Sequence, residues 1–243
     1  MKFARLIALS ALTALPVLAV AGDAPAAGSA PNHSAKAGTE AKDSQVEDVG
    51  LATALAAWGR DHKSPEALIA ASQILSGIPT EAAAASVKTT RTDAVISTSV
   101  KKEESPAPVL DPTALLKEAQ AAAAKKGDKA LSKYVDALVK AGVTGARGAS
   151  GGPKYQVTQV SAGSTDQYNV EFRGGESAEI AVSGDGDTDL DLWVYDEFNN
   201  LVASDAGSTD TAYVSWTPRW TGTFRVEVQN RGAVYNQYVL ITN

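Results

Sequence analysis

Apolar and polar residues alternate in one short stretch after another between positions 155 and 243. Tyr168, Val170 and Phe172, for example, alternate with polar neighbours, and stretches of this kind return throughout the segment. A period of two places successive side chains on opposite faces of a strand, so that one face of each strand can be buried. About eight such strands, separated by turns rich in Gly, Asn and Asp, predict an all-β domain, an antiparallel β-sandwich or jelly roll.

The composition divides the chain at the same place. Twelve of the 15 aromatic residues lie at or after Tyr155, and this acidic part carries a net charge of −9. The preceding residues, 22–154, are rich in Ala and nearly neutral. The absence of Cys excludes disulfides, Cys-ligated metal sites and Cys nucleophiles. The overall charge of −6 argues against nucleic acid or an anionic membrane as a partner.

Residues 1–21 have the features of a secretory signal peptide. Lys2 and Arg5 precede an apolar run, and an Ala-Val-Ala sequence ending at Ala21 offers a cleavage site. The run is shorter than the ~20 apolar residues that a membrane-spanning helix needs. We therefore expect an exported protein, periplasmic or secreted, with no membrane span after cleavage.

Two helical hairpins are predicted before the β-domain, at 47–78 and 111–142. Their start signals are Ser64 and Asp111, each a helix-capping residue followed by Pro at the first helical position. In the first hairpin we expect the apolar stripe that includes Leu51 and Trp58 to be buried, with Trp58 between the two helices. The three remaining segments lack apolar periodicity and are predicted to be disordered or flexible. They are a leader at 22–46, a linker at 79–110 and a Gly-rich linker at 143–154.

Three sequence blocks in the β-domain occur in a familiar order. They are GDGDTDLDLWVYD at 184–196, TGTFRVEV at 221–228 and YVL at 238–240. Together they resemble the corresponding strands of bacterial pre-peptidase C-terminal (PPC) domains, over residues 157–243. The resemblance implies a non-catalytic, jelly-roll-like module appended to secreted enzymes, often peptidases, which in some members binds calcium. No recognisable peptidase precedes the domain here, so an association with a peptidase does not carry over.

Four carboxylates alternate within the first block: Asp185, Asp187, Asp189 and Asp191. Such carboxylates can converge on one cation when a loop curls around it, and their hard oxygen atoms suit Ca²⁺. The block differs from an EF-hand, because Leu190 stands at the loop position that requires Gly. Two interpretations are open, a calcium site and an acidic turn that keeps the edge of the sandwich soluble.

A second candidate site is aromatic. Trp193, Tyr195 and Tyr213 are expected to face solvent, and Trp220 lies in a predicted loop. Exposed aromatic rings can form a platform for sugar rings or peptides. Alternatively, Trp220 folds over the end of the sandwich as part of its core.

The sequence offers little that could support catalysis. His33 and His62 are the only His residues, and neither has an obvious metal-ligand spacing. The favoured interpretation is an exported, non-enzymatic protein whose sandwich serves as a stability or interaction module. One alternative is a carbohydrate- or cell-surface-binding module with a glycan partner. The other is an accessory partner of a secreted peptidase or other enzyme.

Overall fold

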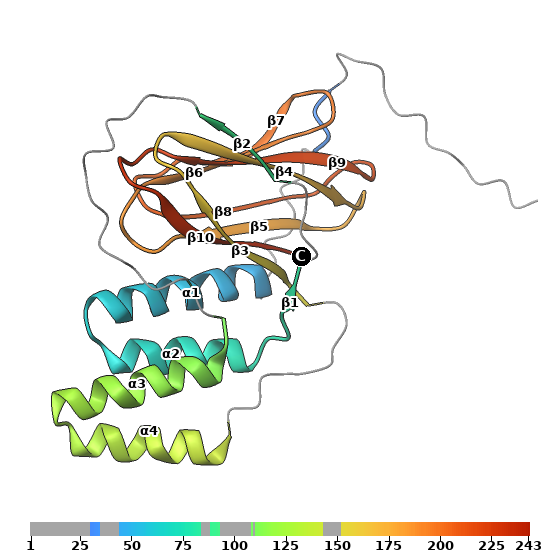
Figure 1. Cartoon of the computed structure of the whole chain (residues 1–243). Coiled ribbons are helices and arrows are strands. Elements are labelled where there is room, and N and C mark those ends of the chain that lie inside the picture. The colour runs from blue at the N-terminus through green and yellow to red at the C-terminus, as the bar shows by residue number, and fades with distance from the viewer. Residues whose placement is uncertain (1–29, 35–43, 84–87, 93–107, 109, 143–151) are drawn as a thin grey trace, which may run out of the picture.

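A computed structural model describes residues 30–34, 44–83, 88–92, 108, 110–142 and 152–243. The predicted signal peptide and most of the predicted Gly-rich linker, residues 143–151, lie outside these residues. Two β-sheets pack face to face, and a stack of helices lies against the outer surface of one sheet (Figure 1).

Within the described residues, ten strands form two five-stranded sheets. Sheet A has the order β1-β3-β10-β5-β8, and sheet B has the order β2-β4-β9-β6-β7. The eight strands numbered β3 through β10 pair with one another only in the antiparallel sense, which confirms the predicted sandwich. The bounds of these eight strands are β3 (Lys154–Val160), β4 (Ser164–Phe172), β5 (Ala178–Ser183), β6 (Leu190–Tyr195), β7 (Leu201–Asp205), β8 (Thr211–Trp216), β9 (Gly222–Asn230) and β10 (Asn236–Thr242).

The core between the sheets follows the predicted alternation. Leu190 and Leu192 of β6, for example, are buried against the facing sheet. The ring centroid of Phe172 lies 4.9 Å from that of Trp216 and 5.9 Å from that of Phe224. Both pairs are edge-on, an arrangement that aromatic rings favour. The large side chains that fill this core therefore come from the aromatic-rich part of the sequence.

The prediction that 79–110 is only a linker is wrong, because this segment supplies two strands. β1 (Glu81–Ala82) pairs in parallel with β3, and β2 (Lys88–Thr92) pairs antiparallel with β4. Thr90 Oγ1 of β2 donates a hydrogen bond of 2.7 Å to Oδ1 of the buried Asp166. The Thr residues of β2 are β-branched and suit an edge strand, although their short run gave no clear alternation.

Four helices precede the sandwich in the described part of the chain: α1 (Gln45–Asp61), α2 (Pro65–Ser76), α3 (Pro112–Lys126) and α4 (Lys129–Ala141). Each begins after a residue whose side-chain oxygen accepts a backbone N–H, and these residues are Ser44, Ser64, Asp111 and Asp128. The predicted hairpin segments thus contain α1 with α2 and α3 with α4. Among the described residues, the helices are too short or too polar to cross a membrane.

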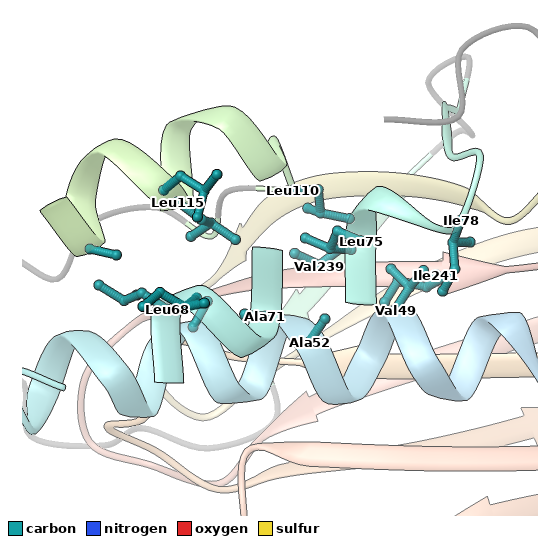
Figure 2. Packing of buried hydrophobic residues seen from close by; sticks show 14 of the residues in the cluster. Val49, Ala52, Leu68, Ala71, Leu75, Ile78, Leu110, Leu115, Val239 and Ile241 are labelled. Atoms are coloured by element: carbon teal, nitrogen blue, oxygen red, sulfur yellow. The ribbon is translucent and has the colours of Figure 1, made fainter. Parts of the chain in front are cut away.

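The helices stack outward from the sandwich in chain order. α1 lies on the outer face of sheet A, α2 packs on α1, α3 on α2 and α4 on α3 (Figure 1). Figure 2 shows the core that joins them, in which Val49 of α1 lies beside Val239 and Ile241 of β10. The position that a Cβ of Gly50 would take lies 3.1 Å from Cβ of Ala181, so a glycine lets α1 lie close to the sheet. The helices and the sandwich therefore share one continuous core.

The buried face of α1 differs from the predicted one. Small residues, among them Ala52, Ala56 and Gly59, are buried, and a Cβ on Gly59 would lie 3.0 Å from Cβ of Ala67 in α2. Leu51 and Trp58 are instead 56% and 50% exposed. The prediction that Trp58 lies between the helices is wrong, because α1 and α2 approach too closely there to hold an indole.

Candidate functional site

Three loops meet at one end of the sandwich, and we call residues 184–191, 205–210 and 231–237 the acidic end. The loop after β5 is held against the start of β8, because Gly184 N donates to Asp210 O at 2.9 Å. The loop after β9 joins it, because Arg231 N donates to Asp189 O at 2.9 Å. These contacts bring Asp205 and Asp210 to the same end as the four predicted carboxylates.

The four predicted calcium ligands do not form one site. Asp185 is half-buried and its Oδ2 accepts from Gln237 N at 3.1 Å, whereas Asp187 is exposed. Asp191 is buried on β6 and lies 3.6 Å from Arg231, while Asp189 is half-buried. Among the described residues, no three acidic or His side chains lie together in a way that could hold a metal. The prediction of a single four-Asp site is therefore wrong, because Asp185 is held by Gln237 N whereas Asp191 lies on β6 beside Arg231.

Asp191 belongs to one of two separate acidic groups. Its pKa is raised, chiefly by burial and then by the charge of Asp189, with a further contribution from Asp205. Arg231 opposes this rise. The guanidinium group therefore already neutralises part of the charge in this group.

The second acidic group surrounds Gly184. A Cβ at this glycine would lie 2.6 Å from both Asp210 Oδ2 and Asn236 Oδ1 and 2.8 Å from Asn236 Nδ2, so side chains from two other loops close over a position where only Gly fits. Asn236 is completely buried, and its Oδ1 has no hydrogen-bond partner. Burial raises the pKa of Asp210 and the charge of Asp185 adds to the rise, whereas hydrogen bonds from Gly186 N and the Asn236 side chain act to lower it. We call Asp185, Asp210 and Asn236 the Gly184 cluster.

Several polar atoms of the Gly184 cluster already have hydrogen-bond partners. Asp210 Oδ2 accepts from Gly186 N, and Asn236 Nδ2 donates to Thr188 Oγ1 at 2.8 Å. The buried Asn236 Oδ1 lacks the hydrogen bond that a buried polar atom normally has. Two of the three residues, Asp210 and Asn236, lie outside the predicted set.

The predicted aromatic platform is also divided by the structure. Trp193 and Tyr195 are half-buried on β6 in sheet B, where the guanidinium carbon of Arg225 lies 4.5 Å from the Tyr195 ring centroid. Tyr213 lies in sheet A beside α1, and its hydroxyl donates to Ser44 Oγ at 3.4 Å. Trp220 lies in the loop before β9, where its Nε1 donates to Glu197 Oε1. The prediction of one aromatic strip is therefore wrong, because these residues belong to different surfaces.

A groove lies between α1 and β8, the edge strand of sheet A. It has a volume of about 250 Å³ and is lined mainly by small and apolar residues, including Leu51, Ala54 and Ala212. Leu51 and Trp58 are seven residues apart, two turns of α1, so both exposed side chains lie on the same side of the helix. The apolar surface of the groove can therefore continue along α1 toward Trp58.

The rim of the groove carries negative charge. Glu47 of α1 and Asp205 of β7 both line it, on opposite sides. Asp205 Oδ2 also accepts from Tyr213 N at 2.9 Å and so occupies one outward-facing N–H of the edge strand. The pKa of Tyr213 is raised, chiefly by burial and also by the charges of Glu179 and Glu47. The groove thus combines an apolar floor with acidic margins.

One buried contact was missed by sequence reasoning, because it lies in the leader predicted to be disordered. Asn32 is completely buried between two turns of the sandwich, the one that joins β6 to β7 and the one that joins β8 to β9. Its Oδ1 accepts from Arg219 N at 2.9 Å and from Trp220 N at 3.2 Å, and its Nδ2 donates to Trp220 O at 3.1 Å. The backbone N–H of Asn32 donates to Asp196 Oδ2 at 2.9 Å. A single polar residue in a segment without apolar periodicity offers no signal from which this could have been predicted.

Comparison with known proteins gives likenesses of fold only. No protein-family model and no curated protein matches the chain. The pre-peptidase C-terminal domain of collagenase from Bacillus anthracis is similar at 16% identity and a TM-score of 0.29, over 36% of this chain and 88% of that chain. The C-terminal CBM6 of a marine laminarinase from Zobellia galactanivorans is similar at 12% identity and a TM-score of 0.22, over 37% of this chain and 90% of that chain. A de novo designed double-stranded β-helix is similar at 7% identity and a TM-score of 0.24, over 37% of this chain and 97% of that chain.

Proposed function

We propose that this protein is an exported, non-enzymatic interaction protein that binds an extended segment of a partner protein in the groove between α1 and β8. The observation that carries the proposal is the apolar groove itself, which borders the edge strand of a sheet. Edge strands and the grooves beside them are recurrent sites for extended peptides. The PPC-like sandwich supports this role as the scaffold that holds the edge strand in place.

The groove also indicates the chemistry of its ligand. Leu51 exposes 56% of its surface, so an apolar side chain of the partner can bury it. Glu47 and Asp205 at the rim favour a Lys or Arg on the same segment. The expected ligand is therefore an extended segment that combines apolar and basic residues.

The structure favours this function over a carbohydrate platform. The aromatic residues proposed for sugar binding are distributed over different surfaces, and Tyr213 is partly covered by the start of α1. The three motif blocks that resemble PPC domains include β6, β9 and part of β10, so the resemblance concerns the scaffold rather than the groove.

Selection from a library of random ten-residue peptides tests the proposal on the whole protein. We expect enriched peptides to contain apolar residues with at least one Lys or Arg. Replacement of Leu51 by Ser should weaken binding of an enriched peptide about three- to tenfold, since burial of half a Leu side chain contributes about 0.75–1.5 kcal/mol. The Glu47→Gln variant should weaken binding of basic peptides and reduce its dependence on salt.

The matched control is Tyr134→Ser on α4, because Tyr134 is also exposed, at 49%, but lies far from the groove in the helix stack. Binding should be unchanged in this variant. If no peptide is enriched, or if Tyr134→Ser weakens binding as much as Leu51→Ser does, the groove is not the binding site.

Export is part of the same proposal and rests on the signal-like residues 1–21. N-terminal sequencing of the mature protein tests it, and Gly22 is the expected first residue. A mature chain that retains Met1 in the cytoplasm would contradict export.

A further inference from the structure

Two turns of the sandwich, 196–200 and 217–221, enclose Asn32, and we call them the Asn32 notch. The first turn is fixed by Asp196, which is only 2% exposed. Asp196 Oδ1 accepts from two backbone N–H groups within its own turn, at 2.8 and 2.9 Å. These bonds do not involve Asn32, so the turn provides one wall of the notch by itself.

The second turn of the notch is held by the turn that joins β4 to β5. Gly175 N donates to Pro218 O at 2.7 Å. The position that a Cβ of Gly174 would take lies 2.6 Å from Cα of Trp220, so the two turns are packed backbone against backbone. Both walls of the notch are therefore positioned by contacts in which the segment around Asn32 takes no part.

The notch contacts both polar atoms of the Asn32 amide. Its Oδ1 accepts from the backbone N–H groups of Arg219 and Trp220, and its Nδ2 donates to Trp220 O. An Asp side chain has no such donor at neutral pH, and a Gln side chain carries its amide one methylene further from the backbone. The backbone N–H of Asn32 also donates to Asp196 Oδ2 at 2.9 Å. The arrangement thus selects Asn.

Residues 30–34 lie on the notch in the way that a short peptide ligand would. His33 N donates to Pro31 O at 2.8 Å, which forms a three-residue turn with Asn32 at its centre. Asn32 is completely buried, whereas Pro31 and His33 are half-buried. The segment therefore inserts one side chain into a site whose walls are already in place.

We propose that the Asn32 notch is a binding site for an Asn residue that another protein presents in a tight turn, and that residues 30–34 are an internal competitor for this site. Because the competitor belongs to the same chain, its effective concentration is in the millimolar range. A second copy of the chain at micromolar concentration offers the same segment and no further contacts, so a different protein is the expected ligand. This site is separate from the groove and does not rest on the function proposed for it.

The contacts set the expected affinity. The three side-chain hydrogen bonds of Asn32 favour the docked segment by a factor of about 30, near the lower end of their combined range. At a millimolar effective concentration, a free peptide of the same sequence should then bind an empty notch with a Kd on the order of 0.1 mM. Its binding to the wild-type protein should be about 30-fold weaker, because the internal segment occupies the notch.

Fluorescence anisotropy of a labelled peptide of residues 28–35 tests the proposal on the full chain. The Asn32→Ala variant loses the side-chain bonds that keep the internal segment docked, so it should bind the peptide with a Kd on the order of 0.1 mM. The wild-type protein should bind it at least tenfold more weakly. Unlabelled peptide at 1 mM should raise the Tm of Asn32→Ala by about 2–4 °C and that of the wild type by less than about 1 °C.

The matched control on the protein is His33→Ala, which keeps Asn32 in the internal segment. It should bind the peptide as weakly as the wild type does. Changes in the peptide test the selectivity for Asn without any change in the fold of the protein. Replacement of the Asn of the peptide by Ala, Asp or Gln should weaken binding to Asn32→Ala at least tenfold, whereas replacement of its His by Ala should leave binding unchanged.

Three results would overturn the proposal. One is the absence of peptide binding to Asn32→Ala at concentrations up to 2 mM. Another is equal binding of the Asn and Ala peptides, or equal binding to wild type and Asn32→Ala, which would place the peptide on a different surface. The third is a wild-type dimer that dissociates in Asn32→Ala, which would make a second copy of the chain the source of the ligand.

Discussion

Replacement of Asn32 by Ala should destabilise the protein, although Asn32 lies in a leader with no apolar pattern. The side chain makes three hydrogen bonds, with Arg219 N, Trp220 N and Trp220 O. Each such bond contributes about 0.5–1.5 kcal/mol net, which gives about 1.5–4.5 kcal/mol for the three. Because residues 30–34 can detach and admit water to the freed groups, we expect a loss near the lower end, about 2 kcal/mol.

Urea unfolding, followed by far-UV circular dichroism and Trp fluorescence, measures this loss. The urea concentration at the midpoint of unfolding should fall, whereas the dependence of the unfolding free energy on urea concentration (the m value) should stay unchanged. The Tm should fall by about 4–8 °C for a chain of this size. Asn32→Asp should be at least as destabilising as Asn32→Ala, because it loses a donor and places a second carboxylate near Asp196. The control is His33→Ala, in the neighbouring position, because the hydrogen bond of the His33 ring is with Ser34 O rather than with the sandwich. This variant should keep the wild-type midpoint.

Deletion of residues 22–34 should cost little more than Asn32→Ala, because Asn32 makes most of the described contacts between this segment and the sandwich. A loss below about 0.5 kcal/mol in Asn32→Ala, within the range of ordinary surface substitutions, would refute the reasoning.

Two further predictions concern cooperativity and pH. Leu115→Ala removes a completely buried side chain of α3 and should lower the free energy of unfolding by about 2–5 kcal/mol. Because one core joins the helices and the sandwich, circular dichroism at 222 nm and Trp fluorescence should both report the same lowered midpoint of urea unfolding. Although burial acts to raise it, the pKa of Asp196 is lowered from its ordinary value of 3.8 by hydrogen bonds from Asn200, Asn32 and Phe198. The carboxylate therefore stabilises the fold above pH 3.8, and this stabilisation is lost as the pH falls through the lowered pKa. The difference in unfolding free energy between wild type and Asp196→Asn should be largest near pH 7 and shrink below pH 4. Urea unfolding across this pH range measures it, and a difference that grows on acidification would contradict the assigned role of the carboxylate.

The sandwich could be predicted from the sequence because several of its strands have one buried and one less buried face. In β6 the apolar residues Leu190, Leu192 and Val194 alternate with residues that face outward, and the pattern is visible without the structure. The starts of α2 and α3 were equally clear, since Ser64 and Asp111 each precede a Pro that suits the first helical turn. Local rules were sufficient wherever one residue or a short period determines the element.

Elements that depend on distant partners could not be predicted in this way. β2 forms because β4 offers an edge, and its short Thr-rich run is compatible with either strand or loop. The buried face of α1 was misjudged because Ala52, Ala56 and Gly59 are small, and their burial depends on how closely α2 approaches. The large residues Leu51 and Trp58 suggested the opposite face.

The same limit explains the Gly184 cluster. The alternating Asp run drew attention to the loop at 184–191, and Asp185 belongs to both the predicted set and the cluster. Asp210 and Asn236 come from the starts of β8 and β10, and only the folding of the sandwich brings them to Gly184. A search for closely spaced acidic residues cannot find side chains that are distant in sequence, and it passes over an amide such as that of Asn236.

The shared core also determines which part of the protein can carry the proposed function. Ala181, Val239 and Ile241 are almost completely buried on the outer face of sheet A, where α1 covers them. Residues 155–243 alone would expose this apolar face to water, which favours association or unfolding. One wall of the groove belongs to α1 and the other to β8, so the isolated sandwich would also lack half of the binding site. The helices are therefore required for the proposed binding site, and a peptide that binds the sandwich without them would bind at a different surface.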